Sequence, residues 1–150
     1  MSNLLNFDPK NREPFAMMVQ TLVQRHGQDP KDLFLHALES RAEPEMNYWT
    51  LLELVQNYFV SPTAPVGEDA EGAPVKPLHA AVLMENPGAL AALLELKAYE
   101  GGVTDHDIQL AARMASRQED QALLAILMKH AEAQGALEPF MRALQNAPLH

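Results

Sequence analysis

The sequence predicts an all-α fold, a short solenoid of helix–turn–helix units with extra helices at both ends. Two observations predict it. Leu and Ala contribute 22 residues each, whereas Val and Ile contribute ten together, and straight-chain or small side chains favour helices over strands. Apolar residues also recur at helical spacing between Pro and Gly residues, and this pattern repeats along the chain.

Two proline-led starts mark the helices of the N-terminal half. Asp29 can cap a helix that begins at Pro30, because a side-chain oxygen at the cap and Pro at the first helical position both favour a helix start. A longer helix is expected after Glu43-Pro44, from Glu45 to Val60. Residues 61–77 hold four Pro, two Gly and three acidic residues, which predicts a mobile loop that folding does not require.

The C-terminal half is divided by the same kind of signals. Thr104 and Asp107 have the spacing of a capping box, in which two side chains satisfy the first backbone groups of a helix. Gly135 predicts a helix stop. The helices expected in this half run from Pro77 to the turn at 85–88, from that turn to Gly101-Gly102, and over Ile108–Met114, Glu119–Ala131 and Phe140–Asn146.

The helix pairs repeat. The positions that correspond at an offset of 30 residues, without a gap, are Leu78 and Ile108, Ala81 and Ala111, Val82 and Ala112, Leu93 and Leu123, Leu94 and Leu124, and Leu96 and Ile126. A weaker copy matches Leu35-His36-Ala37 to Leu78-His79-Ala80. One domain is therefore expected, whose segments are an N-terminal cap (1–28), a degenerate unit (29–60), the loop (61–77), two repeat units (78–102 and 103–132) and a C-terminal cap (133–150).

Residues 76–82 carry a family resemblance. Their sequence, Lys-Pro-Leu-His-Ala-Ala-Val, resembles the ankyrin-repeat signature Thr-Pro-Leu-His-x-Ala-Ala, and Asn86, Leu90, Leu93-Leu94 and Ala98 keep the family's register. The next unit keeps the paired Ala and paired Leu but has Asp107 and Gln109 where Pro and His are expected. Its period is 30 residues, against about 33 in the family.

The resemblance implies structural and functional roles. His79 and His36 would be structural, because the family's histidine hydrogen-bonds backbone and joins neighbouring hairpins. The binding surface would comprise the hairpin tips and the exposed side of each unit's first helix, a concave surface of the kind that repeat stacks form. The residues expected to contact a partner are Glu71, Val75, Lys76, Glu100, Thr104, Asp105 and His106, with Trp49 as an outlier.

Trp49 is added because it lies off the apolar stripe of the helix over residues 45–60, and aromatic residues are enriched in interfaces. Tyr48, Tyr58 and Phe59 are expected in the core. The loop at 61–77 contains two Pro-x-x-Pro sequences, so it is a further candidate binding element, although it lacks the basic residue typical of such ligands.

Composition restricts the kind of partner. The formal net charge is −9, and no Cys is present. An acidic chain without a basic patch disfavours nucleic acid and anionic membranes as partners. No apolar run is long enough to cross a membrane. These features indicate a cytoplasmic protein with a protein partner, basic in character, although secretion as an effector without a cleaved signal stays open.

The sequence gives only weak signals of catalysis or metal binding. Asp105-His106-Asp107 is a cluster of ligand-type residues, but adjacent residues at a helix start point in different directions, whereas zinc needs three or four converging ligands. Glu39, Glu43, Glu45 and Glu53 have no nucleophile or phosphate-binding loop nearby. The sequence therefore predicts a non-catalytic protein-binding module without a cofactor. Such a module could be a bacterial effector or accessory protein. Two alternatives stay open: a dedicated inhibitor, immunity or chaperone-like protein, and a small enzyme that uses Glu and His in an unrecognised cleft.

Overall fold

Helices account for most of the chain in the computed structural model, which describes residues 4–40, 43–100 and 103–145 and, within these, the side chains of all but residues 97–100. The expectation of a mainly helical protein is confirmed. The α-helices are α1 (Arg12–Gln24), α2 (Pro30–Glu39), α3 (Pro44–Tyr58), α4 (Pro77–Leu83), α5 (Pro87–Glu100), α6 (Asp105–Arg117), α7 (Gln121–Ala133) and α8 (Leu137–Gln145). A short 3-10 helix, η1 (Pro9–Asn11), precedes α1, and two short strands, β1 (Gly67–Glu68) and β2 (Pro74–Val75), lie between α3 and α4.

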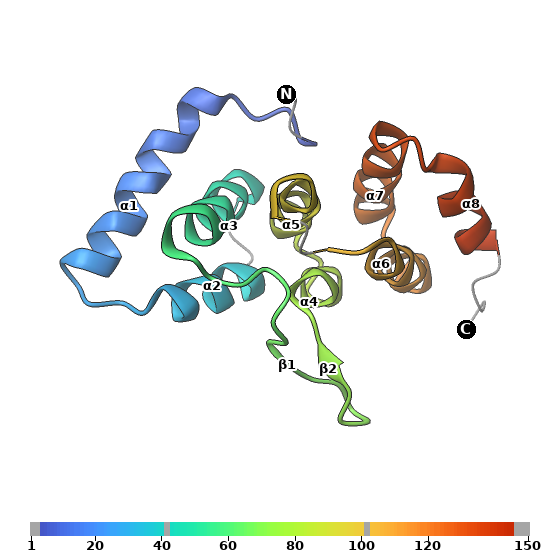
Figure 1. Cartoon of the computed structure of the whole chain (residues 1–150), viewed down its shortest axis with the longest axis horizontal. Helices are drawn as coiled ribbons and strands as arrows, with labels where there is room; N and C mark the ends of the chain where they lie inside the picture. The colour runs from blue at the N-terminus through green and yellow to red at the C-terminus, as the bar shows by residue number, and fades with distance from the viewer. Residues whose placement is uncertain (1–3, 41–42, 101–102, 146–150) are drawn as a thin grey trace.

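The helices from α2 to α7 form two layers. Helices α2, α4 and α6 contact one another in sequence in one layer, while α3, α5 and α7 do so in the other. Helix α1 packs against α3, and α8 packs against α6 and α7 at the opposite end (Figure 1). Each helix pair therefore packs on the next one.

Local sequence signals explain several helix starts. Proline occupies the first turn of α2, α3 and α4, where its missing N–H costs no helical hydrogen bond. Asp29 accepts a hydrogen bond from the Lys31 N–H at 2.9 Å. Thr104 and Asp107 form the expected capping box at the start of α6. The expected helix end at Gly101-Gly102 lies outside the described residues.

The repeated apolar positions share one core. Leu78, Ala81, Leu93, Leu94, Ala111 and Leu123 are buried in a single cluster, and Leu124 packs against it partly buried. The offset of 30 residues thus brings equivalent side chains from neighbouring helix pairs into one apolar interior.

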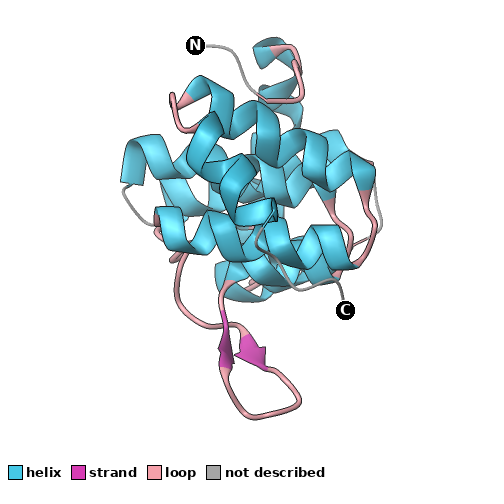
Figure 2. Ribbon diagram, turned by 90° about the vertical axis from the view of Figure 1, so that its right-hand side faces the viewer, coloured by secondary structure: helices cyan, strands magenta, loops and turns pink. Residues whose placement is uncertain are grey.

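The segment at 61–77 contains regular structure that the sequence analysis did not expect. Strands β1 and β2 pair antiparallel, with Gly67 opposite Val75 and Glu68 opposite Pro74. In the turn, an Asp69 carboxylate oxygen accepts hydrogen bonds from the backbone N–H groups of Glu71 and Ala73, both at 2.9 Å. Figures 1 and 2 show this hairpin projecting from the helical layers beside α4. The sequence predicts only a mobile loop here, and the hairpin forms because Asp69 and Gly72 provide the side chain and the left-handed φ of +83° that close its turn. The mobility of the segment stays a prediction.

Among the described residues, no helix combines the length and apolar character needed to cross a bilayer.

Candidate functional site

Two neighbouring cavities lie at the base of the hairpin. The larger, of about 400 Å³, lies between α2 and the segment that runs from the end of α3 towards β1. The smaller, of about 190 Å³, lies between α2, α4 and the hairpin. Leu35 and Val66 line both cavities, so the two form one surface, which we name the hairpin groove. Its lining is mainly apolar in both parts.

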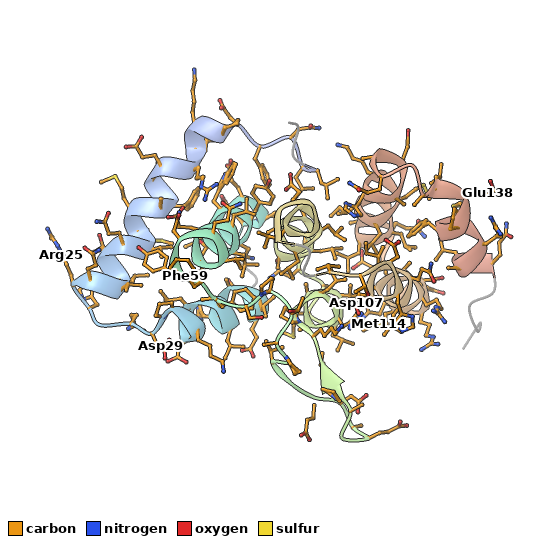
Figure 3. All side chains as sticks on the ribbon, viewed as in Figure 1. Arg25, Asp29, Phe59, Asp107, Met114 and Glu138 are labelled. Atoms are coloured by element: carbon orange, nitrogen blue, oxygen red, sulfur yellow. The ribbon has the colours of Figure 1, made fainter. Side chains whose placement is uncertain are left out.

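Two large apolar side chains of the hairpin groove face solvent. Phe59, which lines the larger cavity, is 90% exposed, and Leu83, which lines the smaller one, is 51% exposed. Figure 3 shows Phe59 at the end of α3. Single exposed apolar residues are ordinary on protein surfaces, but apolar side chains that border a concave apolar surface mark interaction sites.

Phe59 also has an unfavourable backbone conformation. It follows the last residue of α3 in the left-handed region, with φ of 59° and ψ of 28°. Gly or Asn is usual at this position, and for other L-residues the left-handed conformation costs roughly 1–2 kcal/mol. Because the Phe59 ring is almost fully exposed, its burial within the chain offsets little of this backbone strain. Such strain concentrates at functional positions.

Replacing Phe59 with Asn should therefore stabilise the isolated chain. Asn tolerates the left-handed conformation and little buried area is lost, so we expect the free energy of unfolding to rise by about 1 kcal/mol. Urea denaturation of Phe59→Asn against the unmodified chain measures this difference. A loss of stability would show that the ring contributes to the fold instead.

The charged residues around the hairpin groove are mostly acidic. Asp29, Glu39 and Glu68 line the cavities, together with Lys31. Asp69 and Glu71 are exposed on the hairpin that borders the groove. Lys76, at the hairpin base, places its ammonium 3.0 Å from a carboxylate oxygen of Asp107, so its charge is neutralised within the chain.

The sequence-predicted contact residues fall into separate groups. Glu71 is exposed in the hairpin turn, and Val75 lines the smaller cavity. Thr104, Asp105 and His106 are exposed at the start of α6. The ion pair between Lys76 and Asp107 brings the hairpin base beside this helix start. The side chain of Glu100 lies outside the described residues.

Trp49 is buried although a partner contact was expected of it, and Phe59 is exposed although a core position was expected. Trp49 is only 4% exposed, and its indole N–H donates to Glu45 at 3.1 Å. It packs edge-on against Tyr48, with ring centroids 4.6 Å apart. The predicted partner contact by Trp49 is therefore wrong, because α3 is enclosed on several sides, including by α1, α2 and α5. Phe59 is exposed because α3 ends one residue before it.

The two histidines expected to be structural, His79 and His36, differ in burial. His79 is buried, and its Nε2 donates to the backbone carbonyl of Asp107 at 3.1 Å, which joins α4 to the next unit. Burial lowers the pKa of His79, against the opposing effect of the Asp107 hydrogen bond. His36 is exposed, so the inter-unit role expected for it is wrong. The degenerate unit does not present this histidine to a neighbouring backbone.

Two of the four carboxylates considered for catalysis, Glu45 and Glu53, have structural partners. Glu53 accepts hydrogen bonds from the Arg12 guanidinium at 3.1 Å and from Asn57 at 2.6 Å. Glu45 accepts from Asn11 and Trp49. Among the described residues, no group of three potential ligands converges on a metal position.

Asp107 and Glu95 have shifted pKa values for separate reasons. Burial alone would raise the pKa of Asp107, but hydrogen bonds from Thr104 and Lys76 outweigh it and hold the pKa below its ordinary value. Burial raises the pKa of Glu95 to about 7, against hydrogen bonds from Tyr48 and Leu4 and the charge of Lys129. Glu95 and His79 have different neighbours, so the two do not form an acid–base pair.

Replacing Glu95 with Gln should change the pH dependence of stability. Between pH 4.5 and about 7 the folded chain retains a proton at Glu95 that the unfolded chain releases, so this group makes stability fall as pH rises. Glu95→Gln should therefore raise the melting temperature at pH 8, with the gain shrinking towards pH 5. The exposed Glu132→Gln is the control. A gain that is equal at both pH values would contradict the assignment.

Comparison of the chain with models of known families, with curated proteins and with solved structures finds no match. The ankyrin resemblance therefore stays a prediction.

Proposed function

We propose that this chain is a non-catalytic protein-interaction module that binds a partner protein through the hairpin groove. The observation that carries the proposal is the apolar surface at the hairpin base, where two cavities adjoin exposed Phe59 and Leu83. Concave surfaces lined by apolar side chains with a few charged groups are the usual places for binding.

We further propose that the two-layered stack is a divergent ankyrin-like solenoid. The motif at residues 76–82 supports this, because it places Pro77 at the start of α4 directly after a projecting hairpin. The hydrogen bond from His79 to the next unit also supports it. In such a stack the hairpin and the first helices, here α2 and α4, face the partner.

Comparative affinity capture tests the proposal. The full chain, Leu83→Asp and Met17→Asp are immobilised and exposed to lysate of the native cells. Met17 is a matched control, because it is 59% exposed and lies on α1, outside the hairpin groove. We expect at least one protein to be retained by the unmodified chain and Met17→Asp and lost with Leu83→Asp. Equal retention by all three chains would contradict binding through the groove.

A further inference from the structure

The shape of the hairpin groove indicates a segment of polypeptide rather than a flat protein face. The larger cavity, of about 400 Å³, is roomy enough for an aromatic or long aliphatic side chain. The smaller one, of about 190 Å³, shares two wall residues with it. Two adjoining apolar pockets are the arrangement that recognises neighbouring side chains of one short segment.

The charges around the groove select the character of that segment. Asp29, Glu39 and Glu68 line it, and the exposed carboxylates of Asp69 and Glu71 stand on the adjacent hairpin. Lys31 is the one cation among the described lining residues, and Lys76 is engaged by Asp107. This excess of negative charge attracts a positively charged partner and repels an acidic one.

Phe59 and Leu83 provide the apolar contacts. Among the described lining residues they are the exposed large apolar side chains, one beside each cavity. An apolar residue entering the larger cavity would cover the Phe59 ring, and a second would cover Leu83. Aromatic anchors surrounded by a polar rim are typical of interface hot spots.

We infer that the hairpin groove binds a short segment of a partner protein, and that this segment carries two apolar anchor residues flanked by Lys or Arg. This inference rests on the proposed function. The apolar residues occupy the two cavities, and the basic residues face the carboxylates of α2 and the hairpin. Apolar burial then provides most of the affinity, while the charges set the association rate and the preference for basic sequences.

A random-peptide display library, selected on the immobilised full chain, tests this inference. We expect enriched peptides to combine apolar residues with Lys or Arg. Their affinities, measured by fluorescence anisotropy, should weaken by roughly tenfold or more in Leu83→Asp and stay within about twofold in Met17→Asp. Glu39→Lys with Glu68→Lys should weaken binding at low salt, with a difference that shrinks at 0.5 M salt, where screening is strong. Circular dichroism confirms that each variant is folded.

Four results would overturn the inference. Enriched peptides that are acidic, or apolar without basic residues, would reject the proposed chemistry while leaving a protein-binding function intact. Binding that Met17→Asp weakens and Leu83→Asp does not would move the site to another surface. A concentration-dependent dimer in sedimentation, lost in Leu83→Asp, would identify a second copy of the chain as the occupant. Failure to enrich any peptide, together with equal protein capture by all three chains, would reject both the inference and the proposed function.

Discussion

Replacing Asn86 with Ala should destabilise the chain by about 3–5 kcal/mol, because several buried backbone groups would lose their partner. The Asn86 amide donates to the carbonyls of Ala37, Leu38 and Ser40 at 2.8, 3.0 and 3.3 Å. These carbonyls lie at the end of α2, where the last carbonyls of a helix have no intrahelical hydrogen-bond donor. Its side-chain oxygen accepts from the Ala89 N–H at 3.1 Å and so caps α5. One buried side chain thus joins two consecutive helix pairs.

Asn86→Asp separates the two halves of this role. The carboxylate would still accept from Ala89 but could not donate to the three carbonyls, so we expect a loss nearly as large as that of Asn86→Ala. Urea denaturation provides both values, with exposed Gln118→Ala as the control. If Asn86→Ala costs less than about 1 kcal/mol, the hydrogen bonds at this junction contribute little to stability.

Replacing Gly88 with Ala should cost about 3 kcal/mol, although Ala normally favours a helix over Gly by about 1 kcal/mol. A Cβ at this position would overlap the carbonyl oxygen of Pro44 and lie 2.8 Å from its carbonyl carbon and 2.9 Å from its Cα. These are backbone atoms at the start of α3, which cannot rotate away as a side chain can. The two helices would have to move apart, and α5 lies at the centre of the core.

Gly67→Ala is the matched control for Gly88→Ala. A Cβ at Gly67 would meet no atom within 4 Å, so its effect should stay within about 0.5 kcal/mol, as for other open surface positions. Thermal unfolding of both variants measures the contrast. Similar values for the two would show that the close approach of α3 and α5 relaxes at little cost.

The sequence predicts the helical elements well because their signals are local. The proline starts of α2 to α4 and the capping box at Thr104 each involve residues a few positions apart. The core also follows, since the offset of 30 residues relates side chains with the same place in successive units. Asn86 falls in the expected register, but the five hydrogen-bond partners of its side chain among the described residues come from other elements or the next helix start.

The candidate site was harder to predict because it depends on where elements end and what covers them. Trp49 lies off the apolar stripe, yet neighbouring helices bury it. Phe59 continues the stripe by spacing, but α3 stops before it and leaves the ring exposed. The hairpin groove is lined by residues from α2, α4 and the hairpin. These elements are far apart in the sequence, so no local sequence pattern predicts that they lie together. His36 repeats His79 in sequence but is exposed, whereas His79 is buried and donates to the Asp107 carbonyl of the next unit.

Site-specific photo-crosslinking tests binding through the hairpin groove most directly. A photoreactive phenylalanine analogue is placed at Phe59, at Leu83 or at Met17, which is 59% exposed and lies outside the groove, and each chain is irradiated in its native cells. We expect positions 59 and 83 to crosslink to the same protein, through a segment that contains apolar and basic residues, and position 17 to give no such adduct. Adducts to a protein from position 17, with none from positions 59 and 83, would contradict the account.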